Sequence, residues 1–160
     1  MAYDDIEAHL SALGIVPLTD LFEPIGEDTW RAIEAASGGE FPAVVRWLFD
    51  RFGGFRFDES VYYHDHRRQA KALIGWFLDA DELSEAYTST RGSLPADIVP
   101  LANDSNDNFV CVGVGRENAG TVSFYLHDLP TERRHYRLSD SIENFLRALH
   151  REDTATIPLT

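Results

Sequence analysis

The chain has 160 residues, of which 44% are apolar and 12% aromatic, and this composition excludes a disordered acidic tail. A chain of this length buries about 68–70% of its unfolded surface, which is enough for one core and one domain. Its 27 acidic residues outnumber its 14 lysines and arginines, and the net charge of −13 argues against nucleic-acid and anionic-membrane partners, because both require clustered positive charge.

The acidic excess is uneven along the chain. Residues 1–50 hold ten acids and two bases, a net charge of −8, whereas residues 51–160 hold seventeen and twelve, a net charge of −5. Net charge affects solubility before it affects partners, so a well-hydrated surface is one interpretation. A surface that meets a basic protein is the other.

The sequence lacks the signals of export and of membrane insertion. No apolar run approaches the roughly 20 residues that span a bilayer, and the start, MAYDDIEAHL, has neither the basic region nor the apolar core of a signal peptide. We therefore expect a cytoplasmic protein. The single cysteine, Cys111, lies in the apolar stretch FVCVGV, which predicts a buried and unreactive thiol.

The first third of the chain carries three helical patterns. Apolar residues recur at helical spacing over residues 6–13, and Gly14 is placed to end that helix. Residues 15–28 contain two prolines and are interpreted as a connector. Two further helices are expected over residues 30–37 and 42–52, each followed by a Gly-Gly pair.

From Phe55 onward the pattern changes to strands and turns. The segments 55–65 and 72–78 show the alternation or the apolar runs of strands. Asp79 and Glu82 form a capping-box pair, which predicts a helix that begins there and fades near Gly92.

Three more strands are expected at residues 97–102, 108–114 and 120–127. The middle one is apolar on both faces, which predicts a central strand, and the turn GRENAG after it suits an antiparallel hairpin. The last strand alternates two sets of residues, Val122, Phe124 and Leu126 against Thr121, Ser123 and Tyr125. An apolar stripe from Ile142 to Leu149 marks a final helix, with Asp140 as its cap.

These elements predict an α+β fold. We expect one domain over residues 1–160, in which a mostly antiparallel central sheet of about five or six strands packs with about four or five helices. Residues 1–27 form an N-terminal helix and connector, and residues 151–160 form a frayed tail.

A polar run, NDSNDN at residues 103–108, interrupts two apolar segments. Asp104, Asn106 and Asn108 occupy positions 1, 3 and 5 of a calcium-like pattern. An EF-hand loop also requires Gly at position 6 and Glu at position 12, where this chain has Phe109 and Gly115. Because Asn and Asp favour turns by bonding to their own backbone, we interpret the run as a turn between strands.

The remaining candidates for chemistry are weak. His64 and His66 lie on one side of an extended segment, as half of a zinc site would, but the further ligands that zinc requires are missing, and a polar turn is preferred. GVGRENAG resembles a dinucleotide fingerprint only superficially, because Asn118 replaces its last glycine. We expect no catalytic residue, cofactor or metal, and a small metal-dependent enzyme that uses His64 and His66 remains an alternative.

Taken in order, the elements resemble the SUKH superfamily, the Smi/Knr-type domain, over about residues 28–150. EFPAVVRWLFDRFGG resembles the family's second helix, with Phe41 in place of Leu and Phe52 in place of Asn. LPADIVPLANDSNDNFVCVGV resembles its Leu-Pro, Pro-Ile-Ala and polar-turn segment, with Asn where Gly is usual. GTVSFYLHD and LSDSIENFL resemble its closing strand and helix, in which Ser139 and Ile142 depart from Ala and Phe.

The resemblance implies a binding module, in bacteria usually an immunity protein that neutralises a toxin, commonly a nuclease. A basic nuclease suits the acidic charge of this chain. An intracellular regulatory adaptor of the same fold, with a different protein partner, is the alternative. Acids and aromatics at an exposed edge would anchor the partner, and we select Asp58, Tyr62, Tyr63, Asp65, Asp104 and Asp107.

Overall fold

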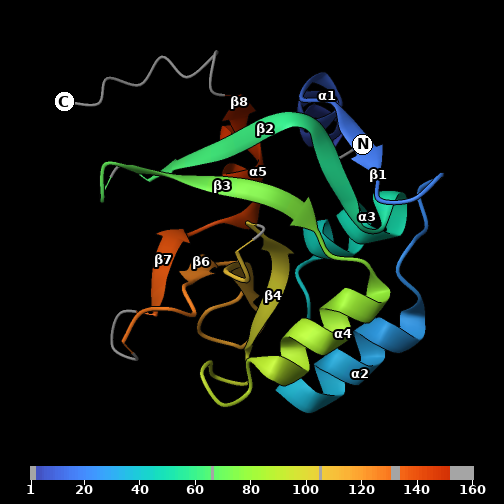
Figure 1. Cartoon of the computed structure of the whole chain (residues 1–160). Helices are drawn as coiled ribbons and strands as arrows, with labels where there is room; N and C mark the ends of the chain where they lie inside the picture. Colours follow the sequence, from blue (N-terminus) through green and yellow to red (C-terminus); the bar gives the residue numbers. More distant parts are fainter. Residues whose placement is uncertain (1–2, 66, 105, 131–133, 152–160) are drawn as a thin grey trace.

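The structure is a computed structural model that describes residues 3–65, 67–104, 106–130 and 134–151 (Figure 1). Its helices are α1 (Asp4–Ala12), α2 (Glu27–Ser37), α3 (Ala43–Phe52), α4 (Ala80–Ser89) and α5 (Ile142–Ala148). Its strands are β1 (Ile15–Pro17), β2 (Phe55–Asp65), β3 (Ala70–Phe77), β4 (Ile98–Asn103), β5 (Phe109–Gly113), β6 (Val122–Tyr125), β7 (His135–Ser139) and β8 (His150–Arg151).

All the strand pairs are antiparallel and belong to one open sheet. Strands β1 to β7 follow one another in chain order across it, and β8 pairs with β2 off this path. The α+β fold class is therefore confirmed, with a sheet larger than the five or six strands expected. The additional strands are short or polar, so their sequences lack a clear strand pattern.

The correction at β1 has a simple physical reason. The prolines of this segment predict a connector, yet Ile15 pairs with Phe57, and Pro17 with Phe55. As the first strand in the sheet order, β1 is an edge strand, where a proline is tolerated. Arg151, assigned by its sequence to the tail, lies in β8 and pairs with Val61, and residues 152–160 lie outside the described part.

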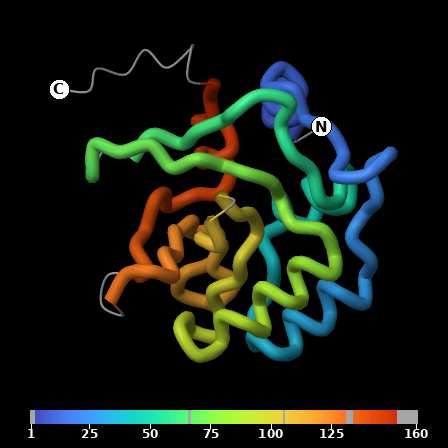
Figure 2. The backbone as a smooth tube through the Cα atoms, in the orientation of Figure 1, coloured from blue at the N-terminus to red at the C-terminus, as the bar shows by residue number. Residues whose placement is uncertain are grey.

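Four of the five described helices form two pairs around the sheet. Figures 1 and 2 show α2 beside α4 along one edge of the molecule, and α1 beside α5 behind the long β2–β3 hairpin. Their buried faces meet an aromatic core in which Phe55 stacks on Phe77 with ring centroids 4.5 Å apart. Trp30 of α2 is fully buried and packs edge-on against Phe49 of α3.

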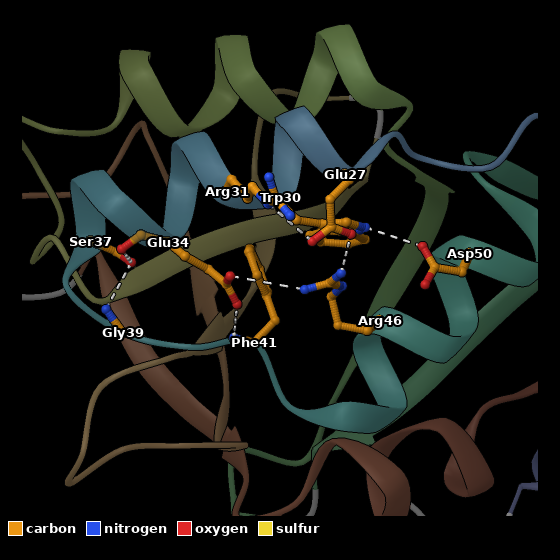
Figure 3. Close-up of polar contacts among 9 residues, drawn as sticks. All are labelled: Glu27, Trp30, Arg31, Glu34, Ser37, Gly39, Phe41, Arg46 and Asp50. Carbon is orange, nitrogen blue, oxygen red and sulfur yellow. Dashed lines mark hydrogen bonds and ion pairs between the residues drawn. The ribbon is translucent and has the colours of Figure 1, made fainter.

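Polar contacts join α2 to α3 (Figure 3). The Arg46 guanidinium lies 2.6 Å from Glu27 Oε2 and 3.9 Å from Glu34 Oε1, and it covers the Trp30 ring at 5.2 Å. The indole nitrogen of Trp30 donates to Asp50 Oδ1 at 3.2 Å. Several acids of the strongly negative first third are therefore engaged within the protein.

Local signals explain where helices begin and end. Gly38 ends α2 in the left-handed conformation, with φ of +76°, as the glycine pattern predicts. Both capping-box bonds of α4 are present, and Leu83, Ala86 and Tyr87 face the core. The prediction of Asp140 as cap of α5 is wrong, because Ser141 Oγ accepts the bond from Asn144 N at 3.2 Å.

Strand β6 is buried on both faces, although its sequence alternates. Tyr125 packs with Leu94, Ile98 and Cys111 in a second, smaller core. Ser123 is buried too, and its hydroxyl lies 2.6 Å from His135 Nε2 on β7. Polar residues are tolerated on a covered face when they are hydrogen-bonded, so alternation alone did not reveal the second core.

Candidate functional site

Three neighbouring strands place one short side chain between two aromatic rings. Asn103 on β4 pairs with Trp76 on β3 and with Phe109 on β5. Residues directly opposite one another in a sheet project from the same face, about 4.8 Å from strand to strand. The row Trp76–Asn103–Phe109 therefore leaves a depression over the amide, with a ring on each side.

Acidic residues border this depression. Glu82 and Glu85 lie one helical turn apart on α4, and Asp107 comes from the β4–β5 loop. Together with the row of three, they line a cleft of about 340 Å³, near the lower limit of the roughly 300–1,000 Å³ typical of ligand pockets. We call it the Asn103 cleft.

The start of α4 fixes the position of one wall. Glu82 Oε1 accepts a hydrogen bond from Asp79 N at 3.1 Å, and Asp79 Oδ1 accepts one from Glu82 N at 2.9 Å. The second oxygen of Glu82 accepts from Trp76 Nε1 at 3.1 Å. The capping box predicted from sequence therefore also holds the indole of Trp76 in place.

The polar run forms the opposite rim. Asp104 Oδ1 accepts from Asn106 N at 2.9 Å and from Asn108 N at 3.2 Å, while its Oδ2 accepts from Asn108 Nδ2 at 2.9 Å. Asp107 has φ of +64°, a conformation that Asn and Asp tolerate better than most residues. The run is thus a turn that carries Asp107, as its composition predicts. The described residues contain no group of three or more potential metal ligands.

Several polar groups of the cleft are unpaired within the described part of the chain. Asn103 is only 8% exposed, yet its Oδ1 has no hydrogen-bond partner there. A buried acceptor left unpaired costs about 1–3 kcal/mol. Glu85 and Asp107 form no ion pair with a described base, and Glu82 bonds only to uncharged donors. The cleft is therefore negative and able to accept further hydrogen bonds.

The residues selected on β2 lie elsewhere. Asp58 is exposed and forms an ion pair with Arg151 at 3.3 Å. Tyr62 is half-buried, with Lys71 Nζ 5.5 Å from its ring centroid. Both remain accessible to a partner.

Tyr63 and Asp65 are engaged in the local structure. Tyr63 stacks on Phe145 at 4.8 Å and donates its hydroxyl to Leu138 O at 2.9 Å. Burial raises the pKa of this hydroxyl above its ordinary value. Asp65 is 5% exposed and accepts from Arg67 N and from Arg68 Nη1, each at 3.1 Å. His64 beside it is also buried, and His66 lies outside the described residues.

The six selected residues do not form one surface. Asp65 pairs with Ala70 at the first end of β3, whereas Asn103 pairs with Trp76 near its other end. Six residues of strand separate these positions by about 20 Å. Of the two residues selected in the loop, Asp104 builds the turn and Asp107 lines the cleft. Sequence reasoning missed the other lining residues.

The cysteine has no part in the cleft. Cys111 is fully buried in β5, and burial raises the pKa of its thiol well above the ordinary value. The expected burial of the thiol is confirmed, and a raised pKa disfavours the reactive thiolate. Among the described residues, no helix has the length and apolar character needed to cross a membrane.

The fold and its cleft define a small antiparallel α+β domain with an acidic, aromatic surface pocket. A family model described as SMI1-KNR4 cell-wall, SUKH_6, matches residues 27–146. Because the match covers most of the chain, the chain belongs to this SUKH family. Domains of the family are generally non-enzymatic, immunity-type modules that bind partner proteins. A comparison with curated proteins found no match.

Proposed function

We propose that the chain is a bacterial immunity protein, which acts in the cytoplasm by covering the basic surface of a toxin. A nuclease fits best as the toxin. The observation that carries the proposal is the Asn103 cleft, whose acids have no basic partner in the described part of the chain. Family membership supports the same class of function.

Charge gives this proposal its physical basis. A nuclease binds phosphates and is therefore basic around its active site. An acidic inhibitor associates with it rapidly, and close charge pairs at such interfaces contribute about 1.5–7 kcal/mol. With a net charge of −13, the chain is suited to that role. Inhibition by coverage requires no catalytic group on the inhibitor.

The partner contacts are proposed from accessibility. Asp107 reaches a partner through the cleft, and Asp58 and Tyr62 form a second contact area on β2. The other selected residues support partner binding indirectly, because their polar groups are bonded within the chain and keep the hairpin and the loop in place. These residues are Tyr63, Asp65 and Asp104.

Co-expression tests the function. The protein encoded by the neighbouring gene is expected to arrest growth when produced alone and to become harmless with this chain. Their complex is expected to weaken as salt rises, because surface charge pairs are screened. Substituting both Glu85→Gln and Asp107→Asn should weaken it at least about tenfold. Asp81→Asn, on the same helix but outside the cleft, is the matched control.

Two outcomes would count against the immunity role. A neighbour that is harmless alone would leave nothing to neutralise. A complex whose affinity is the same in dilute and in concentrated salt would contradict coverage of a basic surface.

A regulatory adaptor of the same fold is the second candidate, favoured by the reference to the cell wall in the family description. Its partner would be a protein without toxicity. Recovery of a non-toxic partner through the same cleft, with growth unaffected by the neighbouring gene, would replace the immunity role with this one.

A further inference from the structure

The Asn103 cleft has the dimensions and the chemistry of a pocket for one side chain. Trp76 and Phe109 form opposite walls, and Asn103 forms the floor between them. We propose that the cleft binds a single arginine side chain of the partner protein, with the guanidinium against the rings and its N–H groups directed at the amide oxygen and the rim carboxylates. This assignment rests on the proposed function, because the arginine belongs to the basic protein that the chain covers.

The buried amide distinguishes this pocket from an ordinary acidic cluster. Asn103 is more than nine-tenths buried, lines the cleft, and leaves Oδ1 without a partner in the described part of the chain. A buried acceptor without a donor is costly, and proteins satisfy almost all such groups. Oδ1 is itself shielded from solvent. A half-turn of the side-chain amide, which exchanges its oxygen and nitrogen, presents the oxygen to an arriving N–H group without movement of the backbone.

The rim supplies the charge that selects a cation. Glu85 and Asp107 are exposed and lie on opposite sides of the cleft, one on α4 and one in the β4–β5 loop. Glu82 adds a third carboxylate, and its bonds to Trp76 Nε1 and Asp79 N hold it in place without neutralising its charge. A cation that enters between them gains from all three.

The aromatic walls favour arginine over lysine. A guanidinium is planar, stacks on aromatic rings and presents five N–H groups in a fixed fork, whereas an ammonium is a compact and strongly hydrated point charge. A slot between two rings suits a flat group, and an amide with nearby carboxylates suits several donors in one plane.

In the described part of the chain, two arginines show this arrangement with a ring centroid 3.7 Å away. The Arg68 guanidinium lies 3.7 Å from the Tyr136 ring centroid and bonds to Asp65 Oδ2 at 3.1 Å. Arg91 lies 3.7 Å from the Tyr87 ring centroid and donates to the carbonyl of Ile98 at 3.0 Å. In both, a ring and an oxygen acceptor share one guanidinium. The Asn103 cleft offers the same groups with no guanidinium from the described chain.

A peptide titration tests the pocket without the toxin. The full chain is titrated with a short capped Gly-Arg-Gly peptide and with its Gly-Lys-Gly counterpart, and the Trp76 indole N–H resonance is followed by NMR. The arginine peptide is expected to move this resonance and to bind about fivefold or more tightly than the lysine peptide. Asn103→Leu should lower the affinity for the arginine peptide at least about tenfold.

Two further variants keep the result interpretable. Glu85→Gln changes an exposed residue, so this variant retains the fold even if Asn103→Leu does not. It should also lower the affinity for the arginine peptide. Asp81→Asn should leave binding unchanged. An unmoved Trp76 resonance, equal binding of the two peptides, or an Asp81→Asn effect as large as that of Glu85→Gln would overturn the assignment.

The outcomes also separate the pocket from the function. If the arginine peptide binds in the cleft but the chain rescues no intoxicated cells, the immunity role fails and the pocket stands. If rescue is salt-sensitive but the peptide does not bind, the pocket fails and the immunity role stands.

Discussion

The two ends of β3 use their polar residues in different ways. At the first end, Asp65 pairs with Arg68 and Tyr63 bonds to Leu138 O, so both groups serve the chain itself. At the other end, Asn103 Oδ1 and Glu85 have no described partner. The comparison teaches that a polar side chain near an exposed edge indicates binding only when its polar groups are not already hydrogen-bonded or ion-paired within the fold.

This difference predicts different costs at the two ends. Variants at the hairpin end should lower stability and leave binding of the arginine peptide in the cleft nearly unchanged. Variants of the unpaired cleft residues Asn103, Glu85 and Asp107 should lower binding and leave stability unchanged or higher, as is common where function requires unsatisfied groups.

The largest effect is expected for Phe145→Ala. Phe145 is fully buried, and its ring stacks against Tyr63. Removing it should lower the free energy of unfolding by about 3–5 kcal/mol, because the transfer free energy is lost and a cavity remains. Urea unfolding followed by circular dichroism measures the change. A loss below about 1 kcal/mol would mean that α5 does not anchor the hairpin end.

Asp65→Ala should lower the free energy of unfolding by about 1–3 kcal/mol. The substitution leaves Arg67 N without this acceptor and Arg68 without its ion pair to Asp65. Asp65→Asn is the matched control, since an amide oxygen can still accept from Arg67 N, and its cost should be smaller. Both variants should bind the arginine peptide as the wild type does. Weaker peptide binding by Asp65→Ala would break the comparison.

Asn103→Leu should raise the free energy of unfolding by about 1 kcal/mol, because it removes a buried acceptor that has no partner. The same variant should bind the arginine peptide more weakly than the wild type. Urea unfolding and peptide titration on one preparation measure both effects. A destabilisation comparable to that of Asp65→Ala would show that the amide contributes to the fold.

The smallest effect concerns pH. Tyr63→Phe should cost about 1 kcal/mol at neutral pH, since it removes one hydrogen bond. Burial raises the pKa of Tyr63 above the ordinary 10.0, so the folded state retains the proton at a pH where the unfolded state loses it. The stabilisation is complete below pH 10 and declines above it.

Unfolding measured at several pH values between neutral and strongly alkaline tests this decline. The gap between the wild type and Tyr63→Phe should narrow as the pH rises. A gap that widens there would contradict the sign of the pKa shift.

The helices could be predicted from local signals, whereas the cleft could not. Gly38 ends α2, and the Asp79–Glu82 pair starts α4, because caps act over three or four residues. The cleft depends on register between strands. Trp76 and Asn103 are 27 positions apart in sequence, and a bulge in the β4–β5 pairing shifts the alternation between Pro100 and Ala102.

Part of the candidate site was nevertheless visible in the sequence. Asp107 was selected as a partner contact, and it lines the cleft. Asp104 was selected beside it for the same reason, yet its oxygens are used by Asn106 and Asn108. Composition identifies a polar turn, but only the folded backbone determines which of its carboxylates are hydrogen-bonded within the turn.

The short pairing between β3 and β4 has one more consequence. In the described pairing, Trp76 is opposite Asn103 and Phe77 opposite Ala102, and Leu78 N donates to Leu101 O at 2.9 Å just beyond them. This is a narrow seam between two more extensively paired parts of the sheet. The Asn103 cleft lies across the seam, with Trp76 on one side and Phe109 on the other. A side chain held there would fasten both parts together, and amide hydrogen exchange would slow on β3 and on β5 alike.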